Sequence, residues 1–191
     1  MPQHAAPLVV IHPPRHHVEI DLVYAGADNL TGRPIYRQPC CLLHPDAERA
    51  LESAIRIAAL AGLRLRILDA YRPAEAQRRL WDALPDSRYV ADLERGSHHS
   101  RGVALDVTLV DGDGSVLDMG TAFDEMSERS HPFHPAVEAA SQRNRLLLLA
   151  IMTQAGFRPI ATEWWHFELD NAIAYPLVDD ERLTCLPLPL R

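Results

Sequence analysis

Two short segments concentrate side chains that could perform hydrolytic chemistry at a metal ion. They span residues 97–106 (SHHSRGVALD) and 163–166 (EWWH). Asp106 lies inside an apolar run, where a charged carboxylate needs a cationic partner or a metal. Catalytic zinc typically takes three protein ligands from histidine and carboxylate and leaves a fourth position for water. His99, Asp106 and His166 could supply such a set.

The second segment also offers a candidate general base. A water activated by a metal needs a group to take its proton, and Glu163 precedes His166 by three residues, close enough to lie beside the metal without binding it. The chain contains no HExxH sequence, which excludes the helical zincin arrangement. Each of these residues taken alone also fits a structural role, so the hypothesis of a metal hydrolase depends on their combination.

The spacing within the two segments places a condition on the backbone. His99 and Asp106 are seven residues apart and would face opposite sides of a regular strand, so a turn or bulge must intervene. Gly102 is the candidate for that turn. Glu163 and His166 would also face opposite sides, so we expect Glu163 to precede the regular strand.

Hydrophobic periodicity and turn residues predict the elements that carry these segments. In chain order, we expect a helix over 45–61, a strand over 63–67 that runs into Asp69, a helix over 73–84, a strand over 103–110 forming a hairpin with 115–119, a helix over 135–155, and strands over 157–160 and 164–169. This order lacks the regular βαβα alternation of a doubly wound sheet. It predicts an α+β fold with a mainly antiparallel sheet, flanking helices and the metal site on the sheet.

The domain organisation is expected to be simple. We predict a single compact domain over 1–191, in which residues 1–17 form an extended N-terminal arm. This arm contains four histidines, but no carboxylate or cysteine falls at ligand spacing with them, which disfavours a metal site there.

Composition limits the classes of partner. The 191 residues carry a formal net charge of -7 with scattered Lys and Arg, which disfavours nucleic acid. The apolar run 146–152 is far shorter than the roughly twenty residues that cross a bilayer, and no secretion signal is visible. The three cysteines suggest neither a disulfide framework nor a CxxC site and are interpreted as buried free thiols. We therefore expect a cytoplasmic protein without nucleic-acid or membrane partners.

The motifs resemble those of the D-alanyl-D-alanine dipeptidases, the family of zinc D,D-dipeptidases that includes the vancomycin-resistance dipeptidase. The strongest matches are Ser97-x-His99-x-x-Gly102-x-Ala104-x-Asp106 and Glu163-Trp164-Trp165-His166. Further segments match in the same order, namely Tyr24-x-x-x-Asp28-Asn29-x-Thr31-Gly32, Asp69-Ala70-Tyr71-Arg72-Pro73, Met119-Gly120-x-x-Phe123-Asp124 and Glu128-Arg129-Ser130-His131. The resemblance therefore covers most of the chain.

This resemblance implies a role for each of seven residues. The ligands of one Zn²⁺ per chain fall on His99, Asp106 and His166, the general base on Glu163, the catalytic arginine on Arg72, and contacts to the ammonium group of the substrate on Ser97 and Asp124. The implied reaction is hydrolysis of the small dipeptide D-alanyl-D-alanine to two D-alanines, linked to peptidoglycan precursor or cell-wall turnover. Zinc would polarise the peptide carbonyl, and Arg72 would stabilise the developing negative charge.

Three other functions stay open. A D,D-carboxypeptidase acting on cell-wall stem peptides is the nearest, although such enzymes usually work outside the cytoplasm. A non-haem iron(II) oxygenase uses the same two-histidine, one-carboxylate set, but the missing all-β pattern and the presence of Glu163 count against it. A non-catalytic metal-binding module is the third. The sequence gives neither the oligomeric state nor the biological purpose, whether antibiotic resistance, cell-wall recycling or use of the dipeptide as a nutrient.

Overall fold

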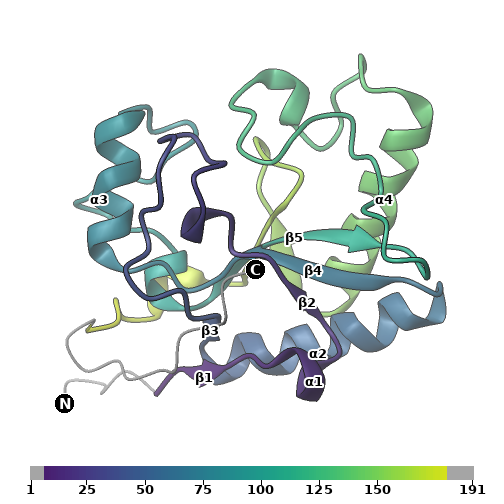
Figure 1. The fold of residues 1–191 in the computed structure, drawn as a ribbon, viewed down its shortest axis with the longest axis horizontal. Helices are drawn as coiled ribbons and strands as arrows, with labels where there is room; N and C mark the ends of the chain where they lie inside the picture. Colours follow the sequence, from purple (N-terminus) through teal and green to yellow (C-terminus); the bar gives the residue numbers. More distant parts are fainter. Residues whose placement is uncertain (1–6, 180–191) are drawn as a thin grey trace.

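The computed structural model describes residues 7–179, and a five-stranded sheet with the order β2-β4-β5-β7-β6 lies at its centre (Figure 1). The strands are β2 (Glu19–Ile20), β4 (Arg64–Asp69), β5 (Ala104–Val110), β7 (His166–Leu169) and β6 (Phe157–Pro159). β2 and β4 are parallel, and the other three pairings are antiparallel. The predicted α+β class with a mainly antiparallel sheet is confirmed, although the sheet is mixed.

Two long helices, α2 (Pro45–Leu60) and α4 (Ala139–Gln154), contact each other and the sheet (Figure 1). α2 buries four side chains at helical spacing, Ala47, Leu51, Ala54 and Ala58, as its sequence period predicts. Leu105 and Val107 of β5 are fully buried in the same apolar core. Because side chains alternate along a strand, Asp106 between them faces the other side of the sheet. The sheet thus separates the apolar core from a polar face.

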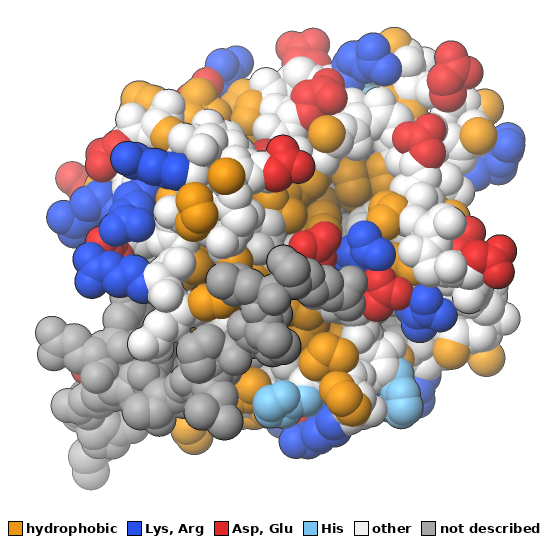
Figure 2. Space-filling view, viewed as in Figure 1, with side chains coloured by type: hydrophobic (Ala, Val, Ile, Leu, Met, Phe, Trp, Pro, Cys, Tyr) orange, Lys and Arg blue, Asp and Glu red, His pale blue; other side chains and the backbone are white. Residues whose placement is uncertain are grey.

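The remaining elements are shorter. They are β1 (Val9–Val10), α1 (Pro13–His16), β3 (Leu42–Leu43), α3 (Ala74–Ala83) and four single 3-10 turns, η1 (Val23–Ala25), η2 (His99–Arg101), η3 (Glu128–Ser130) and η4 (Ala172–Ala174). Of these, β1, α1 and β3 lie beside α2 rather than over the polar face (Figure 1). In the part of the chain that the structure describes, no helix has the length and apolar character needed to cross a membrane. Acidic and basic side chains are interspersed over the face drawn in Figure 2 rather than gathered into one charged patch.

The N-terminal segment differs from the extended arm that we expected. Within residues 7–17, β1 pairs with β3 and α1 forms a helical turn, while Ile11 is fully buried. Cys41 is buried with a free thiol, but Cys40 is disulfide-bonded, so its interpretation as a free thiol was wrong. Residues 1–6 of the expected arm and the third cysteine, Cys185, lie outside the described residues.

The predicted hairpin after β5 is only partly present. The turn is there, because the Asp111 carboxylate accepts the backbone N–H groups of Asp113 and Ser115 at 3.0 and 2.9 Å. The second strand over 115–119 was wrong, since only the isolated bridge between Val110 and Val116 forms. β5 pairs with β4 along one edge and with β7 along the first part of the other, which leaves only its end available.

Candidate active site

Three neighbouring strands present a row of polar residues on the face opposite the helices. Asp106 of β5 lies directly across from His166 of β7 in the antiparallel register. On its other side Asp106 is paired with Asp69 at the end of β4. Directly opposed residues in a sheet have side chains within contact distance on the same face. Strand register alone therefore brings two of the predicted ligands together.

The third predicted ligand, His99, comes from η2, just before β5. The turn closes at Gly102, whose φ of 70° belongs to the left-handed region that glycine adopts at little cost. A Cβ at this position would lie 2.7 Å from Cδ2 of Leu8 and 3.1 Å from the backbone nitrogen of His44. The expected turn at Gly102 is confirmed, and it folds His99 back over the start of the strand.

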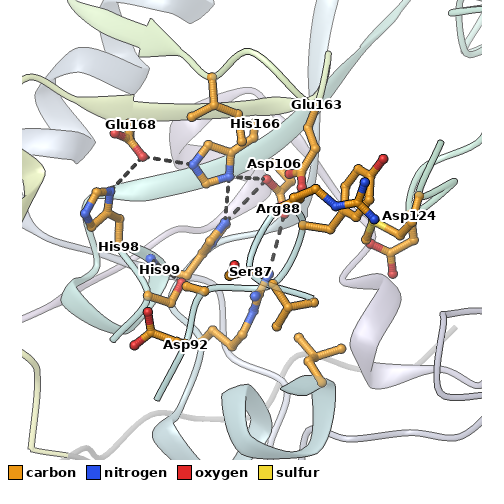
Figure 3. Close-up of a pocket in the computed structure, with 18 of the residues that line it drawn as sticks. Ser87, Arg88, Asp92, His98, His99, Asp106, Asp124, Glu163, His166 and Glu168 are labelled. Atoms are coloured by element: carbon orange, nitrogen blue, oxygen red, sulfur yellow. Dashed lines mark hydrogen bonds and ion pairs between the residues drawn. The ribbon is translucent and has the colours of Figure 1, made fainter. Parts of the chain in front are cut away.

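The three side chains converge on one point (Figure 3). His166 Nδ1 lies 3.1 Å from both His99 Nε2 and Asp106 Oδ1, and His99 Nε2 lies 3.4 Å from the same Asp106 oxygen. Bonds of about 2.0–2.1 Å in a tetrahedral zinc site separate the ligand atoms by about 3.3 Å. The spacing of the three atoms therefore fits a single tetrahedral ion without rearrangement.

Hydrogen bonds on the far side of each ring decide which nitrogen of the neutral imidazole faces the centre of the site. His99 Nδ1 donates to the carbonyl oxygen of Ala70 at 2.7 Å, so its Nε2 carries a lone pair. His166 Nε2 donates to the Glu168 carboxylate at 3.1 Å, which leaves a lone pair on its Nδ1. In the neutral rings, two lone pairs and a carboxylate oxygen then face one another, an arrangement that either a proton or a metal cation stabilises. The donor set fits a divalent metal.

The pKa values of His166 and Asp106 in the metal-free protein also show that positive charge is favoured at this point. Burial by itself would lower the pKa of His166, but its hydrogen bonds with Asp106 and Glu168 raise that pKa to about 10. Burial opposes ionisation of Asp106, yet His99 and His166 hold the pKa of its carboxyl far below the usual range. The pocket thus favours positive charge at the point where the three side chains meet.

Glu163 lies just before β7, as the sequence analysis required, and lines the same pocket. Its residue is 7% exposed, and among the described residues no hydrogen bond of its carboxyl group is found. Burial raises the pKa of Glu163 to about 8, since neighbouring His166 and Arg72 offset only part of the cost of desolvation. A buried carboxyl beside the three converging ligands can hold or release a proton near neutral pH.

Arg72 follows β4, and its guanidinium is held by hydrogen bonds to buried side chains. Its Nε and Nη2 donate to one oxygen of Asp69 at 3.0 and 2.8 Å, and Nη1 donates to Gln77 at 3.0 Å. Asp69 in turn accepts a hydrogen bond from the Tyr36 hydroxyl. A guanidinium has five N–H donors, so one remains on each terminal nitrogen for a group in the pocket. Arg72 is therefore not a surface ion-pair residue.

Asp124 and Ser97 line the pocket, which has a volume of about 510 Å³. Asp124 adopts a positive φ of 60° and accepts the Tyr24 hydroxyl at 2.8 Å with Oδ1, whereas its buried Oδ2 has no hydrogen-bond partner among the described residues. Burial raises the pKa of Asp124 to about 7. The Ser97 hydroxyl accepts the backbone N–H of His99 at 3.2 Å, a turn-stabilising bond that leaves its own proton available.

Comparison with known proteins assigns this arrangement to a family. Residues 5–185 match peptidase family M15, described as D-ala-D-ala dipeptidase. The chain belongs to this family. It is 59% identical to the D-alanyl-D-alanine dipeptidase of Escherichia coli (strain K12) over 174 residues, covering 91% of this chain and 89% of that protein. Proteins with the same name from Enterococcus faecium and Streptomyces coelicolor are 34% and 30% identical, covering 81% and 78% of this chain and 87% and 84% of theirs.

All seven residues that the dipeptidase resemblance singled out line one pocket. The residues that hold them in place were not predicted from the sequence. Arg145 of α4 was read only as part of a helix. It is 3% exposed and donates to the carbonyl oxygens of Met119, Arg129 and His131 at 2.6, 2.9 and 2.8 Å. These bonds fix the loop that carries Asp124. An arginine on the apolar face of a predicted helix was the available signal.

His98, to which the sequence motif assigns no role, contacts a carboxylate at the edge of the pocket. Its Nδ1 lies 2.7 Å from the Glu168 carboxylate, and its side chain is 22% exposed. Glu168, which also contacts His166, was not singled out at all. It follows His166 by two residues in a strand, so both side chains lie on the same face, and that period was the signal.

A second group, His16 with Glu48 and Glu52 of α2, also has ligand atoms within 4.8 Å of one another. His16 Nε2 lies 3.1 Å from the Glu48 carboxylate, which can only accept, so the ring N–H at Nε2 donates to it. Arg15 contacts the same Glu48 oxygen at 3.3 Å. Hydrogen bonding and this ion pair account for the cluster without a metal.

Proposed function

We propose that this chain is a zinc-dependent dipeptidase that hydrolyses D-alanyl-D-alanine to two D-alanines, with one zinc ion per chain. The observation that carries the proposal is the meeting of His99, Asp106 and His166 at tetrahedral spacing in one pocket with Glu163 and Arg72. Membership of the family supports a peptidase, and the names of the relatives support this substrate. Cell-wall or peptidoglycan precursor turnover is the corresponding biological role.

The three converging side chains would hold the metal. When bound, a zinc ion polarises the peptide carbonyl and lowers the pKa of water. Glu163 takes the proton of the attacking water and passes it to the leaving amine, because its carboxyl is buried beside the ligands and none of the described residues competes for it with a hydrogen bond. A carboxyl whose pKa lies close to the working pH is best suited to accept and then return a proton. Burial of Glu163 supplies that match.

Arg72 stabilises the negative charge that develops on the carbonyl oxygen. Its guanidinium is already fixed by Asp69 and Gln77, so no side-chain entropy is lost when the reaction begins. Preorganised donors of this kind act chiefly on the transition state. The remaining N–H groups on the two terminal nitrogens are the donors that we assign to this task.

Recognition of a free amino terminus favours a dipeptidase over a D,D-carboxypeptidase. The buried Oδ2 of Asp124 lacks a partner, and an ammonium group would supply one, with the Ser97 hydroxyl beside it in the same pocket. A longer stem peptide has an amide at this position, which carries no charge. It would leave the carboxylate without its cation, and unpaired buried polar groups are the basis of strong discrimination.

The test is an assay of purified protein with D-Ala-D-Ala, L-Ala-L-Ala and a pentapeptide ending in D-Ala-D-Ala, each with and without chelator. We expect chelator-sensitive turnover of D-Ala-D-Ala alone and one zinc per chain by elemental analysis. His166→Ala should lose the zinc, whereas His134→Ala, outside this pocket, should keep it. Comparable cleavage of the pentapeptide would support a carboxypeptidase, iron with oxygen uptake would support an oxygenase, and metal without turnover would support a binding module.

A cytoplasmic location, the absence of nucleic-acid and membrane partners, and a single domain over the whole chain stay predictions.

A further inference from the structure

The carboxylate of Glu168 joins two histidines at the edge of the pocket. Its Oε2 lies 3.1 Å from His166 Nε2 and 2.7 Å from His98 Nδ1, and Figure 3 shows the two rings on either side of it. None of the activities proposed above uses Glu168 or His98. One oxygen of Glu168 therefore accepts hydrogen bonds from His166, a predicted metal ligand, and from His98, the neighbour of the predicted ligand His99.

The fold holds Glu168 firmly in this position. It lies on β7, where its backbone is paired with Ala104 of β5 on one side and Arg158 of β6 on the other. Its side chain is 21% exposed. The carbonyl oxygen of His98 accepts the N–H groups of Arg101 and Val103 at 3.1 and 3.3 Å, so the turn that carries His99 also holds His98. Glu168 thus ties the strand that carries one ligand to the turn that carries another.

We propose that Glu168 is a positioning residue for the metal ion, acting through His166; this rests on the proposed zinc site. A carboxylate only accepts hydrogen bonds, so the proton of the neutral His166 ring is held on Nε2 and the lone pair on Nδ1 points at the metal position. Rotation of the ring would break this bond and turn Nδ1 away from the metal position, and a shift of the proton to Nδ1 would remove the lone pair. His98 donates to the same oxygen and fixes the carboxylate's orientation.

The partners of the two histidine ligands are of different kinds. His99 donates to a backbone carbonyl, that of Ala70, whereas His166 donates to a charged side chain. A carboxylate partner raises the basicity of a ligating imidazole, and loss of such a partner typically costs about 10- to 100-fold in metal affinity. The side chain of Glu168 can be replaced, so its contribution can be measured directly.

The experiment compares Glu168→Gln with Asp170→Asn. Asp170 follows Glu168 by two residues and forms an exposed ion pair with Arg158 at 2.7 Å, so its change removes one carboxylate charge from the same end of the sheet without touching the pocket. Zinc affinity is measured on metal-free protein by titration against a chromophoric chelator. We expect the zinc dissociation constant of Glu168→Gln to rise about 10- to 100-fold, with that of Asp170→Asn unchanged.

Two further measurements separate positioning from a general structural role. The melting temperature of metal-free Glu168→Gln should stay near the parent value, and the visible absorption of the cobalt-substituted protein should change in Glu168→Gln but not in Asp170→Asn. If Glu168→Gln does not fold, Glu168→Asp, which keeps the charge but withdraws it by one methylene, is measured in the same way.

Equal zinc affinity in the parent and the Glu168 variant would overturn the inference. Failure of the parent itself to bind zinc would instead overturn the proposed function, so the two failures are distinguishable.

Discussion

Replacing Glu163 by glutamine should lower the catalytic rate and raise the stability of the metal-free protein at high pH. Glutamine keeps the shape of the side chain but cannot accept a proton from water, and general acid–base catalysis contributes about 10²- to 10⁴-fold. Zinc-loaded Glu163→Gln is therefore expected to lose at least about two orders of magnitude in kcat while it keeps its zinc. The metal-free protein should show a second effect, because Glu163 is buried and makes no hydrogen bond with any residue in the range 7–179.

The second effect follows from the pKa of the Glu163 carboxyl. Burial raises this pKa from 4.5 to about 8 in the folded protein. Between these two values the folded protein holds a proton that the unfolded chain has released, so the stability of the metal-free parent falls as pH rises through this window and levels off above it. The glutamine variant lacks this dependence.

The size of the difference can be bounded. The shift in the Glu163 pKa spans three to four units, and each unit corresponds to about 1.4 kcal/mol. At pH 9, relative to pH 4, metal-free Glu163→Gln should gain up to about 5 kcal/mol over the parent. A change of 1 kcal/mol moves the melting temperature of a protein of this size by about 2–4 °C, so the upper limit is about 10–20 °C.

The assay is a series of thermal melts of metal-free parent and variant from pH 4 to pH 9, with turnover and zinc content measured on the loaded proteins. Glu94→Gln, at an exposed carboxylate outside this pocket, is the matched control and should follow the parent throughout. Parallel melting profiles for parent and Glu163→Gln would refute the account of a buried, proton-holding carboxyl. Retained activity would remove Glu163 from the mechanism, and loss of zinc would make it a ligand.

Three further variants test the groups around the metal ligands. Arg72→Lys cannot keep both hydrogen bonds to Asp69, so we expect kcat to fall about 10²- to 10³-fold with little change in KM. Steady-state kinetics in which only KM changes would contradict this. Asp124→Asn should raise KM for D-Ala-D-Ala about 10- to 150-fold, the equivalent of a charged hydrogen bond of about 1.5–3 kcal/mol. The N-acetylated dipeptide lacks the ammonium group, so we expect it to be cleaved weakly by the parent and equally weakly by Asp124→Asn. Equal effects of the substitution on both substrates would exclude the ammonium contact. Arg145→Lys should remove hydrogen bonds to the loop that carries Asp124. We therefore expect faster amide hydrogen exchange in residues 119–131 and a higher KM at unchanged zinc content. Unchanged exchange would show that Arg145 does not hold this loop.

Local patterns in the sequence were sufficient to predict the main elements and the three side chains that converge in the pocket. The period of apolar residues gave α2 nearly to its ends, since the predicted range 45–61 became Pro45–Leu60. The mismatch between the spacing of two predicted ligands and the period of a strand required a turn at Gly102, and the backbone there has the positive φ that such a turn needs. Both inferences depend only on neighbours in the chain.

Features that depend on distant partners were missed. The segment 115–119 after β5 forms only an isolated bridge between Val110 and Val116 and does not continue as a strand, which the turn residues before it do not record. The contact between His98 and Glu168 joins residues 70 positions apart. Arg145 was hidden for the same reason, because its acceptors are carbonyl oxygens of a loop that no sequence period describes. Supporting residues are harder to find than reacting ones, because their chemistry is that of ordinary hydrogen bonding.

The hydrogen bonding of the buried groups nevertheless separates the two kinds of residue. Asp69 and Arg145 support the site and are satisfied by several partners each. Two carboxyl groups that line the pocket differ from these: Glu163 is buried and makes no hydrogen bond with the described residues, and the buried Oδ2 of Asp124 has no partner among them, while Asp124 adopts a positive φ as well. An unpaired buried acceptor and a backbone in this region each cost about 1–3 kcal/mol. Such a cost is retained in a folded protein when a ligand offsets it. The unpaired oxygen of Asp124 therefore points to the position of the substrate's ammonium group, and the carboxyl of Glu163 points to that of the attacking water.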